Sequence, residues 1–154
     1  MILIHEDTEI DETVKLGEDV VIWQFATICE DTEIGENSVI GSCVWIGKNC
    51  IIGKNVRIQH GVFIPHGTII EDDVFIGPNV TFTDDKYPRS GAPYVHMPPK
   101  ICTGASIGAG ATILPGVIIH AGSMIAAGAI VTKNVEMGDL VRGTPSRSVN
   151  HEFH

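Results

Sequence analysis

The sequence has few basic side chains and no long apolar run. Its 154 residues include 10 lysines and arginines against 19 aspartates and glutamates, which gives a net charge of −9. This balance argues against nucleic acid or an anionic membrane surface as a general partner. The longest uninterrupted apolar segment is far shorter than the ~20 residues that cross a bilayer, so we expect no membrane-spanning segment.

Cysteine is also scarce, and its spacing offers no paired motif. The four cysteines, Cys29, Cys43, Cys50 and Cys102, form no C-x-x-C pair. The opening MILIHEDTEI carries too many charges for a secretory leader, so we expect a protein of the reducing cytoplasm. A chain of this length is expected to form one domain, which would comprise residues 1–154.

What the sequence does have is a strict period of six residues. An isoleucine or another apolar residue recurs at Ile4, Ile10, Leu16, Ile22, Ile28, Ile34, Ile40, Ile46, Ile52, Ile58, Ile64, Ile70, Ile76 and Phe82. After a break, the same position recurs at Ile101, Ile107, Ile113, Ile119, Ile125, Val131 and Met137. Neither a helix nor an alternating strand gives this period, which is typical of repeat architectures.

The other positions of each hexad indicate a short strand followed by a tight corner. The residue four places after the isoleucine is small and apolar, as in Val44, Cys50 and Val56. The residue three places after it is often Asn, Asp or Gly, which tolerate a left-handed backbone, and the next residue after the isoleucine is often Gly. Two side chains of each hexad would point inward, and stacked coils would bond to each other as parallel sheets.

This pattern resembles the hexapeptide-repeat acyltransferases. In that family three hexads form one coil of a left-handed parallel β-helix, and the left hand is implied by the resemblance, because general sheet sterics favour right-handed crossovers. We therefore expect an all-β protein, a left-handed parallel β-helix of about seven coils. The coils would comprise residues 1–82 and 101–141, with an ejected loop over 83–100 and a short C-terminal cap over 142–154. Four prolines and two tyrosines in the loop are typical of an irregular segment.

With three hexads in each coil, residues 18 apart stack on one face. His66 then lies beneath Asp84, and His60 lies one corner earlier in the same coil. A histidine beside a carboxylate suits acid–base chemistry, although surface histidines or a subunit contact would give the same pattern. Trp23 and Phe25 break the hexad preferences with bulky rings, which suggest an interface or a ligand platform, or are simply exposed.

The segment GPNVTFTDDKYPRS, residues 77–90, is similar to one in the nucleotide-linked amino-sugar N-acetyltransferases, as are IQHGV before it and WQF near the N-terminus. The resemblance implies acetylation of the 3-amino group of a dTDP- or UDP-linked hexose during the synthesis of surface polysaccharides. It makes Gln59, Tyr87 and Arg89 candidate substrate-binding residues.

The resemblance also implies a direct transfer, in which the sugar amine attacks acetyl-CoA and CoA leaves. The chain departs from the subfamily where Asp84 replaces an asparagine and where His60 and Gly61 replace an asparagine pair. We take His60 as the candidate general base, Asp84 as the group that binds the amine, and His66 as the alternative base or orienting residue. A backbone N–H of a coil would stabilise the oxyanion, and no metal is required.

The C-terminal stretch AAGAIVTKNVEMGDLVRGTPSR resembles the acetyl-CoA end of hexapeptide transferases, where pantetheine lies between two subunits. The resemblance implies a homotrimer, and it makes the following residues candidates for binding acetyl-CoA: Gly108, Ala109, Ala126, Ala127, Lys133, Arg142 and Arg147. Small side chains let a thin ligand approach the backbone, and the cations can meet phosphates. Small residues that only narrow the coil would give the same sequence.

Three other functions fit parts of the pattern. A serine- or galactoside-type O-acetyltransferase shares the CoA end but lacks the FT…PRS segment. A γ-class carbonic anhydrase needs three histidines on zinc, two of them spaced H-x4-H, whereas His60 and His66 are spaced H-x5-H. A non-catalytic scaffold of the same fold is the third alternative, and a failure to bind CoA would favour it.

Overall fold

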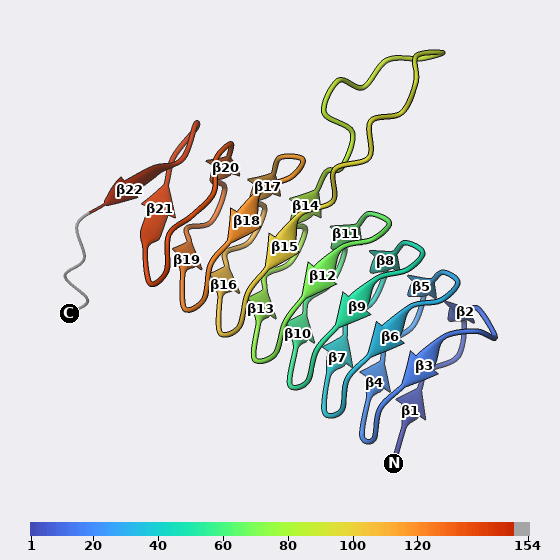
Figure 1. The fold of residues 1–154 in the computed structure, drawn as a ribbon. Helices are drawn as coiled ribbons and strands as arrows, with labels where there is room; N and C mark the ends of the chain where they lie inside the picture. Colours follow the sequence, from blue (N-terminus) through green and yellow to red (C-terminus); the bar gives the residue numbers. More distant parts are fainter. Residues whose placement is uncertain (150–154) are drawn as a thin grey trace.

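The computed structural model describes residues 1–149, and three sheets form the faces of a prism (Figure 1). The nine-stranded sheet contains β1 (Leu3–Ile4), β4 (Val21–Ile22), β7 (Val39–Ile40), β10 (Arg57–Ile58), β13 (Phe75–Ile76), β16 (Ser106–Ile107), β19 (Met124–Ile125), β21 (Leu140–Arg142) and β22 (Arg147–Val149). The seven-stranded sheet contains β2 (Glu9–Ile10), β5 (Thr27–Ile28), β8 (Trp45–Ile46), β11 (Phe63–Ile64), β14 (Thr81–Phe82), β17 (Thr112–Ile113) and β20 (Ile130–Val131). The six-stranded sheet contains β3 (Lys15–Leu16), β6 (Glu33–Ile34), β9 (Ile51–Ile52), β12 (Ile69–Ile70), β15 (Lys100–Ile101) and β18 (Ile118–Ile119).

From β1 to β17, each strand pairs in parallel with the strand three places later, because every coil contributes one strand to each face. β7 pairs in parallel with β4 and β10, and the partners are 18 residues apart, as Ile22, Ile40 and Ile58 are. The left-handed parallel β-helix of hexapeptide repeats expected from the sequence is thereby confirmed. No helix among residues 1–149 is long and apolar enough to cross a membrane.

The second residue of each two-residue strand points into the prism. Ile22, Ile40 and Ile58 are fully buried, and the small residue four places further on packs into the same interior. Cys50 occupies one of these small positions, and burial raises the pKa of its thiol to about 11. Cys50 is therefore a core residue and not a nucleophile at neutral pH.

The corners adopt the left-handed backbone that the Asn, Asp and Gly pattern predicts. Asn37, Asn49 and Asn55 have φ angles of 58°, 55° and 55°. Phe25 and Cys43 adopt the same conformation, with φ angles of 62° and 59°, although larger side chains disfavour it. Phe25 therefore holds an exposed ring at a strained position of the repeat.

Glycine is required where the corner of one coil touches the next coil. A Cβ atom at Gly47 would lie 2.6 Å from the backbone nitrogen of His66, and one at Gly108 would lie 2.5 Å from that of Ala127. Carbon atoms do not approach backbone nitrogen so closely without displacement. The spacing of the coils at Gly47 and at Gly108 therefore accepts no larger residue without a shift of the backbone.

The two ends of the prism depart from the repeat. Ile4 of the first coil is 46% exposed, because this coil has a neighbour on one side only. The hexad count predicts an inward position for Met137, and this prediction is wrong, since Met137 is 76% exposed. The last coil is two residues shorter than the others: Leu140 pairs with Met124, 16 residues before it. Val141 consequently takes the buried position.

The last strand of the nine-stranded sheet covers the edge of β21. β22 runs antiparallel to β21, with Arg142 opposite Arg147. This strand lies within the predicted cap, residues 142–154, and it protects an edge of β21 that would otherwise be unpaired. Residues 150–154 of that prediction lie outside the described residues.

Between β14 and β15 the chain leaves the prism as the predicted loop (Figure 1). The two arms of the loop meet beside the prism, where Asp85 and His96 form an antiparallel bridge. The N–H of Met97 donates a hydrogen bond to the carbonyl oxygen of Asp84 over 2.6 Å. The base of the loop is thus fixed, and its tip projects away from the coils.

Candidate functional site

Two corners of the prism carry the residues that the sequence singles out. Corner 1 follows the strands of the nine-stranded sheet and consists of residues 5–6, 23–24, 41–42, 59–60, 77–78, 108–109 and 126–127. Corner 2 follows the strands of the seven-stranded sheet and includes residues 47–48, 65–66, 83–84, 114–115 and 132–133. His60 lies on corner 1 together with the small residues expected to bind CoA, whereas His66 and Asp84 lie on corner 2.

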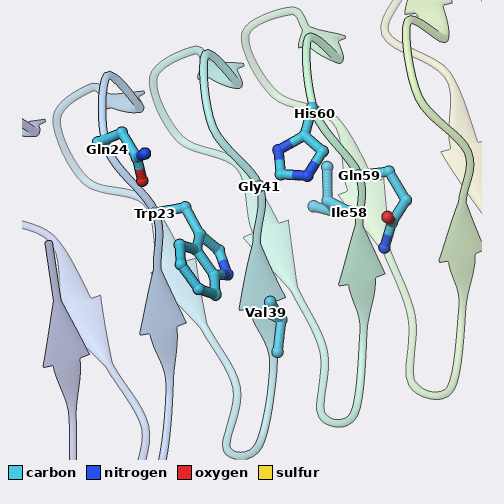
Figure 2. Close-up of a pocket in the computed structure, with 7 residues that line it drawn as sticks. All are labelled: Trp23, Gln24, Val39, Gly41, Ile58, Gln59 and His60. Carbon is cyan, nitrogen blue, oxygen red and sulfur yellow. The ribbon is translucent and has the colours of Figure 1, made fainter.

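A groove of about 360 Å³ lies beside His60 on corner 1 (Figure 2). We call it groove 1, and it is lined by Trp23, Gln24, Val39, Gly41, Ile58, Gln59 and His60. Trp23 lies on one side of Gly41, and Gln59 and His60 lie on the other (Figure 2). The groove therefore joins two features that are separate in the sequence, the indole ring of Trp23 and the polar pair Gln59 and His60.

One hydrogen bond fixes where the neutral His60 ring carries its proton. The backbone N–H of Ser42 donates to Nδ1 of His60 over 2.9 Å. Nδ1 is therefore unprotonated, and the neutral ring carries its proton on Nε2. In this state Nε2 is a hydrogen-bond donor with no lone pair to accept a proton. The general-base role expected for His60 would require the hydrogen bond from Ser42 to break.

His66 is held in the same way on corner 2. The backbone N–H of Lys48 donates to Nδ1 of His66 over 2.7 Å, and the Trp45 ring meets the imidazole edge-on at 5.5 Å. The neutral His66 ring thus also carries its proton on Nε2. β11 lies between His60 and His66 along the coil, so the chain places the two histidines on different corners. Residues 1–149 contain no group of three His, Cys, Asp or Glu side chains arranged to hold a metal ion.

Asp84 is held by two loop residues, Tyr94 and His96, that the sequence pattern does not single out. The hydroxyl of Tyr94 donates to Oδ2 of Asp84, and Nε2 of His96 lies 3.5 Å from the same oxygen. Nε2 of His96 also lies 2.7 Å from the carbonyl oxygen of His66. Burial and the hydrogen bond to Asp84 raise the pKa of Tyr94, which keeps its hydroxyl protonated. Only 14% of the Asp84 side chain is exposed, so this carboxylate anchors the loop.

The two loop residues predicted to bind substrate lie beyond the bridge of Asp85 and His96 at the base of the loop. Tyr87 is 63% exposed, and Nζ of Lys86 lies 5.5 Å from the centre of its ring. Arg89 is also exposed. Neither residue lines groove 1, whereas Gln59, the third predicted substrate-binding residue, does.

A second groove, of about 430 Å³, lies on corner 1 nearer the C-terminal end. We call it groove 2, and it is lined by Phe75, Ser106, Ile107, Gly108, Met124, Ile125, Ala126, Ala127 and Leu140. Three of the residues expected to bind CoA are among these, and Ala109 follows Gly108 on the same corner. Because these small side chains project little from the corner, a narrow ligand can approach the backbone there.

The predicted phosphate-binding residues lie in the C-terminal coils. Arg142 ends β21 and continues corner 1 beyond Ala126, and Arg147 lies opposite it on β22. Lys133 lies on corner 2, and with Arg147 it lines a cavity of about 280 Å³. Arg142 therefore follows groove 2 on corner 1, whereas Lys133 and Arg147 share a separate cavity in the C-terminal coils.

The sequence matches the family described as bacterial transferase hexapeptide (six repeats) over residues 13–48, 49–84 and 98–133. These segments make up most of the chain, and the protein belongs to this family. A search of curated proteins found no match to the sequence.

Several solved structures share the fold. The acetyltransferase domain of PglB from Neisseria gonorrhoeae, in complex with acetyl coenzyme A, is 18% identical with a TM-score of 0.66, over 96% of this chain and 57% of that one. A mutant GDP-perosamine N-acetyltransferase from Caulobacter crescentus, in complex with CoA and GDP-perosamine, is 20% identical with a TM-score of 0.64, over 97% and 57%. A galactoside acetyltransferase in complex with coenzyme A is 31% identical with a TM-score of 0.71, over 77% and 64%. The chain thus spans little more than half the length of the first two.

Proposed function

We propose that the protein transfers the acetyl group of acetyl-CoA to the amino group of a nucleotide-linked amino sugar, as a cytoplasmic step in the synthesis of surface polysaccharide. The observation that carries the proposal is the order of sites along corner 1. Groove 1 with His60 comes first, the small turn at Gly77 and Pro78 follows, and groove 2 comes next. Of the proteins that share the fold, one was solved with CoA and an amino-sugar nucleotide and another with acetyl-CoA, which supports the proposal.

Groove 2 suits the pantetheine arm of acetyl-CoA. Corner 1 advances by one strand spacing, about 4.8 Å, for each coil, so three coils separate His60 from Ala127 by about 14 Å. A narrow chain laid over Gly108 and Ala126 would point its thioester toward His60. Its phosphates would then lie near Arg142, where a guanidinium can bind them.

The proposed transfer forms one bond and breaks another. The neutral amine attacks the thioester carbonyl carbon, a C–N bond forms, and the carbonyl oxygen becomes an oxyanion. Collapse of this intermediate breaks the C–S bond and expels CoA as its thiolate. The proton lost by nitrogen neutralises the thiolate, directly or through water. The protein then has to align the two substrates and stabilise the oxyanion.

His60 is placed to stabilise the oxyanion. Its Nε2–H can donate a hydrogen bond to the oxyanion while Ser42 holds Nδ1. We therefore assign His60 as an oxyanion donor in place of a general base.

Asp84 and His66 lie on the other corner of the prism, and Tyr87 and Arg89 on the loop that leaves it. This corner and the loop that Asp84 anchors would border the site of a neighbouring subunit if the site forms between subunits. The exposure of Phe75 and Met124 beside groove 2, at 41% and 40%, supports such a second wall. We propose a homotrimer, and light scattering should give about three times the chain mass of 16.5 kDa.

An O-acetyltransferase is the second candidate. The galactoside acetyltransferase that was solved with CoA is 31% identical over 77% of this chain. Both candidates would use groove 2 for CoA and differ in the nucleophile, which is a hydroxyl group in one and an amine in the other.

A panel of acceptors tests the proposed function. Acetyl-CoA is offered with dTDP-, UDP- and GDP-linked amino sugars and with galactosides, and the product is identified by NMR as an amide or an ester. We expect an amide from an amino-sugar nucleotide. An ester formed only from galactosides would select the second candidate.

Variants of the site residues test the roles in the same assay. His60→Ala should lower kcat by a factor of about 100 or more, the usual effect of losing an oxyanion donor. His60→Gln, which restores an N–H donor, should recover part of this loss. If His60→Ala and Asp84→Ala both keep the wild-type kcat/KM, the assignment of these residues is wrong.

A further inference from the structure

In the first four coils, corner 1 carries a row of large side chains with one gap, at Gly41. The residues at the first corner position of successive coils are His5, Trp23, Gly41 and Gln59. The rings of His5 and Trp23 are stacked, with centroids 4.3 Å apart and planes inclined by 14°. Trp23 is 38% exposed, and Gly41 in the next coil has no side chain to continue the stack.

The gap leaves a slot between Trp23 and Gln59. Two coil steps separate these residues by about 10 Å, because adjacent parallel strands lie about 4.8 Å apart. A flat ring in van der Waals contact with both walls needs a separation of about 7–8 Å between them. The slot is therefore wide enough to admit one ring. The slot coincides with groove 1, and Figure 2 shows Trp23 across Gly41 from Gln59 and His60.

The fold requires Gly41, but nothing in the coil spacing requires Trp23. A Cβ atom at Gly41 would lie 2.7 Å from the carbonyl carbon of Gln59 and from the nitrogen of His60, so the coil stack accepts only glycine there. Gly41 is therefore not evidence of binding by itself. A partly exposed indole beside a groove is different, because such rings commonly provide an apolar platform with a polar edge.

The walls of the slot suit a sugar ring. The indole offers a flat surface to the C–H face of a pyranose, and the amide of Gln59 and the amide nitrogen of Gln24 can bond to hydroxyl groups. Oε1 of Gln24 is buried and has no hydrogen-bond partner among the described residues. His60, which we propose to contact the reacting acetyl group, lines the same slot.

A nucleobase fits the position less well. In a nucleotide-linked sugar, a ribose and two phosphates separate the base from the sugar. A base stacked on Trp23 would hold the amine well away from His60 on the same groove, so the acetyl group could not reach it.

We propose that the slot between Trp23 and Gln59 binds the pyranose ring of the acceptor, stacked on the Trp23 indole with its amino group toward His60. This inference rests on the proposed function, and it makes Trp23 a substrate-binding residue. It also places the acceptor and acetyl-CoA end to end along corner 1.

The two tryptophans of the chain allow a direct test by fluorescence. Trp45→Phe leaves Trp23 as the only tryptophan, and Trp23→Phe leaves Trp45, which stacks on Phe63 with centroids 5.0 Å apart. Without CoA, we expect a dTDP-linked 3-amino sugar and the methyl glycoside of the same amino sugar to quench Trp23 in a saturable manner. They should leave the emission of the Trp23→Phe protein unchanged. Quenching of Trp23 by dTDP alone would assign the slot to the nucleobase and overturn the proposal.

Steady-state kinetics test the sugar-binding role of the slot separately from the proposed acetyl transfer. Trp23→Leu should raise KM for the acceptor at least tenfold and leave KM for acetyl-CoA unchanged, whereas Trp45→Leu should change neither. An unchanged acceptor KM in a Trp23→Leu enzyme that still transfers acetyl groups would contradict the slot and leave the function standing. Quenching by the methyl glycoside with no acetyl transfer would support the slot and refute the function.

Discussion

At the scale of single residues, glycines in neighbouring positions meet two different physical requirements. Gly108 has no room for a side chain, since a Cβ atom there would lie 2.5 Å from the backbone nitrogen of Ala127. Gly110 has open space around it but a φ angle of +68°. The first requirement comes from the stacking of coils, and the second comes from the left-handed corner.

These two glycines should respond differently to the same substitution. Gly110→Ala should lower the free energy of unfolding by about 1 kcal/mol, the cost of a left-handed alanine. Gly108→Ala should cost more, up to about 3 kcal/mol, because the coils must separate to admit the methyl group. Urea unfolding of both variants measures the difference. Equal losses, or a larger loss for Gly110→Ala, would contradict this account of the coil spacing.

The sequence locates His60 but does not fix its chemistry. The hexad count places it at a corner, and the structure places it in a groove with Trp23. The hydrogen bond that decides its tautomer comes from Ser42, 18 residues away in the preceding coil. Any corner N–H or carbonyl of that coil could have met the ring, so the sequence alone leaves the direction of the hydrogen bond open.

At the scale of elements, Glu71 joins the coil before the loop to the coil after it. Its Oε2 accepts hydrogen bonds from the backbone N–H and the hydroxyl of Thr103, over 2.9 and 3.0 Å. Nζ of Lys100 lies 3.1 Å from its Oε1. The N–H of Thr103 and then the ammonium of Lys100 hold the pKa of Glu71 below its ordinary value.

The stabilisation from Glu71 should depend on pH with a defined sign. Because the folded-state pKa lies below the unfolded value of about 4.3, ionised Glu71 stabilises the fold above that pH, and the effect is lost as pH falls through the folded-state pKa. Glu71→Gln should therefore lower stability at pH 7, by less than about 1 kcal/mol since the pair is partly solvated.

Urea midpoints of the wild type and Glu71→Gln, measured in steps from neutral to acidic pH, check this sign. The two midpoints should converge on acidification. Glu12→Gln, a substitution at an exposed corner, serves as the matched control and should have little effect at any pH. A difference that widened in acid would contradict the assignment.

The elements themselves are largely predictable, because the hexad period fixes them locally. The strands, the corners and the break between Phe82 and Lys100 follow from residue types at fixed offsets. The contacts that anchor the loop do not follow, since Tyr94 and His96 reach Asp84 only after the chain returns to corner 2. The exposure of Met137 is also not predicted, because the hexad count assumes that the last coil is as long as the others.

At the scale of the whole molecule, the prism is a rigid frame that arranges sites in a line. Corner 1 carries groove 1, groove 2 and Arg142 in succession, one coil after another. The spacing of 18 residues between stacked positions predicts which residues lie along corner 1. It does not predict the volume of either groove, which depends on how side chains such as Trp23 and Met124 lie over the faces.

CoA binding measured by isothermal titration calorimetry tests the central claim, that corner 1 carries the acetyl-CoA site, most directly. Ala127→Phe places a ring in groove 2 at an exposed corner residue, whereas Ala121→Phe makes the same change at a corner outside the groove. We predict that the wild type and Ala121→Phe bind CoA alike and that Ala127→Phe raises Kd at least tenfold with an unchanged Tm. Equal binding by all three proteins, or no binding by the wild type, would contradict the account.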